Sequence, residues 1–136
     1  MDFSASMAVA ASGMRAQSDR MKTIAENIAN ANSASATAGG EPYRRKIATV
    51  TSEFDRQLNA TVVSSGEPIA DMSDFRTQYD PGNPQADKQG YVKLPNVNSL
   101  VEIMDMREAQ RSYEADLTVM DATKSMLART VDLLNK

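Results

Sequence analysis

The chain carries a stripe of apolar residues repeated every seven positions at each of its two ends. Each stripe has a companion set of apolar residues, which Gln17 interrupts near the N-terminus and Gln110 and Lys124 interrupt near the C-terminus. A seven-residue apolar repeat forms the seam of a coiled coil, so we predict two long terminal helices that pack on other helices. The N-terminal stripe comprises Met7, Met14, Met21 and Ile28 with companions Phe3, Ala10, Ile24 and Ala31, and the C-terminal stripe comprises Met106, Tyr113, Met120, Leu127 and Leu134 with companions Ile103, Leu117 and Val131.

The middle of the chain changes to the two-residue period of a β-strand. Residues 43–54 alternate in this way and are rich in β-branched side chains, and residues 60–63 and 90–94 are shorter runs of the same kind. The loop at 80–84 contains two prolines and a glycine, which prevent regular ladder pairing. The middle is therefore predicted to be a small, irregular β element.

These patterns predict a mainly α fold with a small β element. The two terminal helices are expected to form an antiparallel, coiled-coil-like pair. We expect an N-terminal helix within residues 1–32, a linker of small residues and the irregular β segment over 33–96, and a C-terminal helix within 97–136. The second helix has Asn96, Asn98 and Ser99 as rival caps, the last in capping-box spacing with Glu102.

Gly13 lies inside the predicted N-terminal helix, where a glycine costs about 1 kcal/mol relative to alanine. It is either a tolerated defect or a point of close approach by a neighbouring backbone. The small residues Ala10, Ala11, Ser12 and Ala16 keep the same surface thin.

The composition predicts a chain that needs partners to complete its core. Leu, Ile, Val and Phe make up 24 of 136 residues, and the net charge is only −3. Such a sparse core barely offsets the entropy of ordering the helices, so we expect partial disorder in the isolated chain and order in a complex. The first residues lack the basic segment of a secretory signal, and no apolar run is long enough to span a bilayer. Export, if it occurs, is expected to use another route.

The chain has few residues suited to catalysis. Without His or Cys, Ser-His-Asp and Cys-His mechanisms, the usual zinc sites and disulfides are excluded. The carboxylate pairs Asp71 with Asp74 and Asp80 with Asp87 remain, but solvated loops explain them better. The basic run 44–46 is interpreted as a solvated strand face rather than a phosphate contact. We therefore expect no enzyme activity, no catalytic, cofactor-binding or metal-binding residues, no nucleic acid and no small-molecule substrate.

Several segments resemble one known family, in the same order and over nearly the whole chain. They are residues 11–17 (ASGMRAQ), 27–32 (NIANAN), 43–46 (YRRK), 79–84 (YDPGNP), 90–98 (GYVKLPNVN) and 111–115 (RSYEA). The chain is similar in these segments to the bacterial flagellar rod and hook proteins.

The resemblance implies a structural subunit of the proximal rod, the hollow driveshaft that crosses the periplasm in the flagellar basal body and serves motility. It implies that the terminal helices form an inner coiled-coil layer with the middle segment outside. It also implies export through the flagellar type III apparatus without a cleaved signal peptide. The implied partners are copies of the chain itself, the rod proteins FlgB, FlgF and FlgG, the FliE adaptor and the membrane ring base.

We expect the assembly interface to lie on the two stripes and on the asparagines of the N-terminal signature. Two other functions stay open on the sequence alone: a coiled-coil adaptor for a helical partner outside a rod, and a carboxylate-dependent wall hydrolase. The expected interface residues are Met7, Gly13, Met14, Met21, Ile24, Asn27, Ile28, Asn30, Met106, Tyr113, Leu117, Met120, Leu127, Val131 and Leu134.

Overall fold

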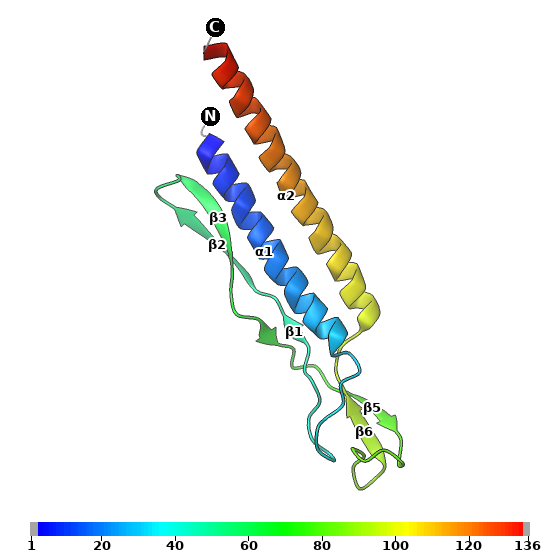
Figure 1. Cartoon of the computed structure of the whole chain (residues 1–136). Helices are drawn as coiled ribbons and strands as arrows, with labels where there is room; N and C mark the ends of the chain where they lie inside the picture. The colour runs from blue at the N-terminus through cyan, green and yellow to red at the C-terminus, as the bar shows by residue number, and fades with distance from the viewer. Residues whose placement is uncertain (1–2, 135–136) are drawn as a thin grey trace. The chain divides into compact units, whose positions relative to one another are not determined.

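The computed structural model describes residues 3–134, which form two long helices and six short strands (Figure 1). Helix α1 spans Phe3–Ala29 and helix α2 spans Ser99–Leu134. The predicted mainly α fold with a small β middle is confirmed. The strands are β1 (Lys46–Ile47), β2 (Val50–Asp55), β3 (Ala60–Ser65), β4 (Ile69–Ala70), β5 (Arg76–Tyr79) and β6 (Tyr91–Leu94).

Helix α2 is capped by Asn98. The Asn98 side-chain oxygen accepts a hydrogen bond from the Leu100 N–H at 3.1 Å, and its carbonyl accepts one from the Glu102 N–H at 3.0 Å. This is the geometry of an N-cap residue. The capping box that the spacing of Ser99 and Glu102 suggested does not form. The Glu102 carboxylate accepts hydrogen bonds from Asn27 and Arg45 instead.

The six strands form three separate antiparallel pairs. Strand β1 pairs with β4, β2 with β3, and β5 with β6. The single strand predicted over 43–54 is wrong in extent: it divides into β1 and β2, and these pair with different partners. A two-residue period shows which side chains share a face but not which strand lies alongside, so the division could not be read from the pattern.

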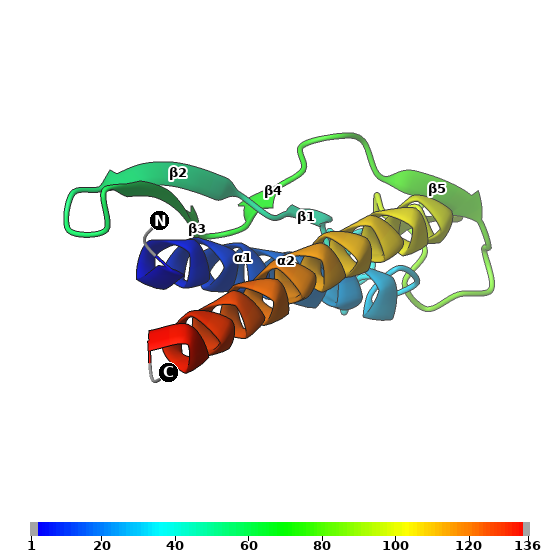
Figure 2. The ribbon, with the colours of Figure 1, turned by 90° about the horizontal axis from the view of Figure 1, so that it is seen from above.

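Contacts divide the described chain into two compact units, and each unit takes part of both helices. In the first unit, residues 3–21, 49–67 and 107–134, helix α1 lies between α2 and the β2–β3 hairpin (Figures 1 and 2). Arg20 Nη2 lies 3.3 Å from Glu108 Oε2, and Gly13 faces Asp116, so the two helices run antiparallel as predicted. On the hairpin side, the Ser12 hydroxyl oxygen accepts a hydrogen bond from the Val63 N–H at 3.1 Å.

The second unit contains residues 22–48 and 68–106. Its buried apolar side chains are Ile24, Ala31, Val92 and Val97. The β5–β6 hairpin is stiffened by Tyr79 and Tyr91, whose rings meet edge to face with centroids 5.2 Å apart.

Neither helix within residues 3–134 has an apolar stretch that could cross a bilayer.

Candidate assembly interface

The face of α2 that meets α1 is built from small and polar residues. Glu102 in the second unit, and Ala109, Asp116 and Thr123 in the first, recur every seven residues along α2. Glu102 and Ala109 are 0% exposed and Thr123 is 3% exposed. This buried repeat was not recognised in the sequence, because none of its members is a large apolar residue.

In the first unit, the facing side of α1 also consists of small residues. Ala10 and Ala16 are buried there, and Gly13 is so close to α2 that an added Cβ would lie 2.5 Å from Asp116 Oδ2. The close approach considered for Gly13 therefore exists, but it comes from a side chain and not from a neighbouring backbone. Among the described residues, the buried apolar set contains no Leu, Met or Phe.

The large residues of the C-terminal stripe lie mostly outside this seam. Leu117, Leu127, Val131 and Leu134 are 41%, 40%, 48% and 81% exposed. Further apolar side chains are exposed on the same helix: Leu100, Val101, Ile103, Met104, Val119, Met126 and Leu133. Leu127, Val131 and Leu134 share one face at the end of α2 because their spacings are three, four and seven residues, and an exposed apolar patch of this kind is typical of a protein–protein contact surface.

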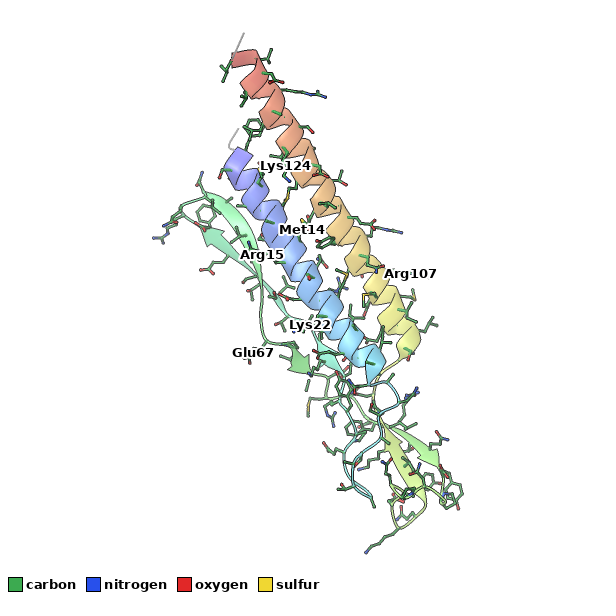
Figure 3. All side chains as sticks on the ribbon, in the orientation of Figure 1. Met14, Arg15, Lys22, Glu67, Arg107 and Lys124 are labelled. Atoms are coloured by element: carbon green, nitrogen blue, oxygen red, sulfur yellow. The ribbon has the colours of Figure 1, made fainter. Side chains whose placement is uncertain are left out.

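The methionines of the N-terminal stripe and the central residues of the C-terminal stripe are half-buried. Met14, on the α2 side of α1 (Figure 3), lines a hollow of about 310 Å³ together with Tyr113 and Met120. Flexible thioether side chains around an open hollow suit a contact with an incoming apolar side chain. The other half-buried members of the predicted interface are Met7, Met21, Ile28 and Met106.

The two predicted asparagines have different surroundings. Asn30 lies just past the end of α1, where its Nδ2 donates to the Glu26 carbonyl at 2.9 Å and its Oδ1 accepts from the Ser33 hydroxyl at 3.2 Å. Asn27 is only 1% exposed and belongs, like the buried Ile24, to the interior of the second unit.

A polar cluster in the second unit joins both helices to the β segment. Asn27 Nδ2 donates to the Lys46 carbonyl at 2.8 Å and to Glu102 Oε2 at 3.0 Å. Its Oδ1 accepts from the Lys46 N–H at 2.9 Å and from the Tyr43 hydroxyl at 2.8 Å. Burial is the main cause that raises the pKa of the Tyr43 phenol above 10.0.

Arg45 is the cation of this cluster. Its Nε donates to Glu102 Oε1 at 2.5 Å, and its terminal nitrogens lie 3.4 Å from Asp71 Oδ2 and 3.6 Å from Asp105 Oδ2. Burial opposes the charged form of Arg45, but the bonds to Glu102 and Asp71 outweigh it and raise the pKa of the guanidinium above its ordinary value. The interpretation of residues 44–46 as a solvated strand face is therefore wrong for Arg45.

Asn96 holds the same strand from the other side. Its Oδ1 accepts from the Arg45 N–H at 2.7 Å, and its Nδ2 donates to the carbonyls of Asp71 and Ser73 at 3.0 and 3.2 Å. Hydrogen bonds from the Ser73 backbone and side chain, followed by Arg45, hold the pKa of the Asp71 carboxyl below 3.8. Among the described residues no group of His, Cys, Asp and Glu could hold a metal ion. Where Glu102 and Asp71 come together, Arg45 bonds both.

The sequence pointed to Asn27 as an interface residue. It did not show that Tyr43, Arg45, Asn96 and Glu102 form one cluster with it. The signal was present in part, since the resembling segments 27–32, 43–46 and 90–98 contain three of these four and Asn27 itself. Glu102 lies outside all of them. Its neighbours could be identified only once the chain was folded.

Comparison with known proteins agrees with the sequence resemblance. Residues 7–36 match the family described as "Flagella basal body rod protein", and residues 88–133 match "Flagellar basal body rod FlgEFG protein C-terminal". The first match covers most of α1 and the second covers nearly all of α2.

Whole-length relatives carry the same description. The flagellar basal-body rod protein FlgC of Agrobacterium fabrum is 49% identical over 97% of this chain and 95% of its own length. The proteins of the same name in Bacillus subtilis and Salmonella typhimurium are 38% and 36% identical, over 94% and 92% of this chain and 95% and 92% of their own lengths. The chain belongs to the FlgC family of flagellar basal-body rod proteins.

Proposed function

We propose that this chain builds the proximal part of the flagellar rod by packing the exposed and half-buried residues of its apolar stripes against neighbouring subunits. Membership of the FlgC family makes it a structural rod component and not an enzyme, and it implies assembly with rod subunits. In this proposal the helices within residues 1–32 and 97–136 form the inner layer of the rod, and residues 33–96 lie outside them.

One observation supports the proposal above all others. The most deeply buried residues of the α1–α2 contact are small or polar, while Leu127, Val131 and Leu134 remain exposed on the last two turns of α2. Covering a side chain of this size contributes about 1.5–3 kcal/mol, so a row of them can drive association. A contact between different patches of identical subunits gives a closed ring where the rotation closes and an open helical array where it does not, and a rod requires the second arrangement.

The partners in this proposal are copies of the chain, the rod proteins FlgB, FlgF and FlgG, the FliE adaptor and the base of the membrane ring. The chain reaches them through the flagellar type III export apparatus. A core made mostly of alanine and valine, without disulfides, suits passage in an unfolded state because little structure has to be undone.

The test is to replace Leu127 by Glu in a motile strain that depends on this chain. Burying an unpaired carboxylate in an apolar contact costs several kcal/mol, so we expect exported protein, no completed rod and no swimming. The matched control is Ala128→Glu, which places the same side chain on the next exposed residue, outside the stripe.

Both variants are compared for export, for basal bodies seen by electron microscopy and for swimming. The proposal requires that Ala128→Glu assembles normally while Leu127→Glu does not. Normal rods and swimming with Leu127→Glu would contradict it. Equal failure of both variants would show that added charge, and not loss of the stripe, stops assembly.

A further inference from the structure

Asn27 uses every hydrogen-bonding position of its side chain. A carboxamide offers two N–H donors and one oxygen that can accept twice. Nδ2 donates to the Lys46 carbonyl and to Glu102 Oε2, and Oδ1 accepts from the Lys46 N–H and the Tyr43 hydroxyl. Asn27 thus bonds both the N–H and the carbonyl of Lys46, as a neighbouring strand would. Its other N–H donates to Glu102 on α2.

The bond between Asn27 and Glu102 crosses from one helix to the other. Glu102 is 0% exposed and Asn27 is 1% exposed, so neither can turn to water if the bond is lost. A buried carboxylate without its partners is costly. The second oxygen of Glu102 is held by Arg45, which approaches from the strand that Asn27 binds. The three residues can satisfy one another only when position 102 lies opposite position 27.

Apart from the fit of Gly13 against Asp116 and the exposed ion pair between Arg20 and Glu108, the rest of the helix contact specifies the register weakly. Along the seam in the first unit the buried residues are Ala10, Ala16 and Ala109, and small side chains fit nearly as well after a shift. A shift by seven residues keeps the same helix face inward, but it replaces Glu102 by Ala109 opposite Asn27. In coiled coils a single buried polar residue is known to select register at such a seam.

We propose that the bond between Asn27 and Glu102 is a register lock, which makes attachment of the β1 strand conditional on correct alignment of the terminal helices. Asn27 is a positioning residue in this proposal. Its amide bonds Glu102 only when the helices are correctly aligned, and the same amide binds Lys46.

Register can be measured by crosslinking, because the chain contains no cysteine. Arg20 and Glu108 face each other in the observed register, whereas a seven-residue shift would bring Ala115 opposite Arg20. Two versions of the purified full chain are made, with Arg20→Cys combined with either Glu108→Cys or Ala115→Cys. A short thiol-specific crosslinker then reports the ratio of observed to shifted register.

Asn27→Asp is the informative variant. It keeps the shape of the side chain but removes both donors, and it places a second carboxylate beside Glu102. We expect the crosslinking ratio to fall at least about tenfold, the value of one hydrogen bond to a buried charged group. Asn30→Asp is the matched control, since the same change three residues away removes only a bond to the carbonyl of Glu26.

The double variant Asn27→Asp with Glu102→Gln reverses the donor and acceptor across the helices. A donor on residue 102 then meets an acceptor on residue 27, so we expect the ratio to recover. The Lys46 carbonyl lacks its partner in both the single and the double variant. Amide exchange in β1 should therefore be faster in both of them than in the unsubstituted chain. Recovery of register without recovery of β1 would separate the two roles of Asn27.

Each other outcome overturns the proposal. These outcomes are an unchanged ratio in Asn27→Asp, an equal fall in Asn30→Asp, a double variant that does not recover, and absence of the 20–108 crosslink in the otherwise unsubstituted chain. Loss of both crosslinks together in Asn27→Asp also overturns it, because the bond would then supply pairing and not register.

Discussion

Replacing Gly13 by Ala sets two opposite effects against each other at one position of α1. Alanine is the better helix former, which favours the substitution by about 1 kcal/mol. The new methyl group, however, would lie 2.5 Å from Oδ2, 3.0 Å from Cγ and 3.3 Å from Oδ1 of Asp116. Real methyl groups do not come so close to these atoms, so Asp116 must change rotamer or the helices must separate.

Relief of that overlap requires the half-buried Asp116 side chain to leave its place beside Gly13, and the usual penalty for overpacking is about 1–3 kcal/mol. Gly13→Ala should therefore lower the free energy of unfolding by up to about 2 kcal/mol, although it improves helix propensity. In an Asp116→Ala background the obstacle is absent, and the same substitution should raise it by up to about 1 kcal/mol. The two backgrounds should thus differ by about 1–3 kcal/mol in their response to Gly13→Ala.

The assay is urea unfolding followed by the helical circular dichroism signal, on the unsubstituted chain, both single variants and the double variant. The interaction free energy of the cycle is the quantity of interest, because the effect of each substitution on the unfolded chain cancels. An equal stabilisation by Gly13→Ala in both backgrounds would refute the reasoning. It would mean that Asp116 moves aside at no cost and that the close contact does not constrain residue 13.

Three further predictions concern other parts of the molecule. Arg45→Met should lower the free energy of unfolding in urea titrations by about 3 kcal/mol, because it leaves Glu102 buried without its cation. The double variant Arg45→Met with Glu102→Leu should lose clearly less stability. An equal or larger loss of stability in the double variant would contradict this. The pKa of the Asp71 carboxyl is held below the ordinary 3.8, so its contribution to stability is present above pH 4 and is lost as the pH falls through the pKa of the folded state. The midpoint of thermal unfolding between pH 3 and 6 should therefore depend less on pH in Asp71→Asn than in the unsubstituted chain. An identical pH dependence in the two proteins would contradict this prediction. Amides of residues 127–134 should exchange rapidly in the dilute chain and slowly in assembled rods, and slow exchange there in the isolated chain would show that partners are not needed to order this segment.

The two helices could be predicted because each carries a long periodic pattern without internal proline. The seven-residue repeats also identified α1 and α2 as packing helices. The repeats drew attention to Met and Leu residues, however, whereas the most deeply buried residues of α2 are Ala109, Thr123 and Glu102. Apolar periodicity finds the large apolar residues, and in this chain the last of them on α2, Leu127, Val131 and Leu134, are exposed.

The β segment was predicted less well for a different reason. Strand β5 has the sequence Arg76–Tyr79 without an apolar alternation, and β4 has only two residues. Next to the β1–β4 pair, the Asp71 N–H donates to the Arg45 carbonyl at 2.8 Å, a bond between residues far apart in sequence. Interactions of this kind leave no local pattern, so the polar cluster around Arg45 could not be recognised before the fold was known.

The placement of polar and apolar residues separates two requirements on a rod subunit. Alignment within the chain is set by a few directional bonds around Asn27 and Glu102, which tolerate little displacement. Attachment between chains, in the proposed function, is left to Leu127, Val131 and their neighbours, whose contacts are non-directional and can fit neighbours that are not identical. If the large apolar residues lay in the seam, the isolated chain would gain stability and the stripe would lose the area that drives assembly. We therefore expect a weakly packed isolated chain, because that area is kept available for its neighbours.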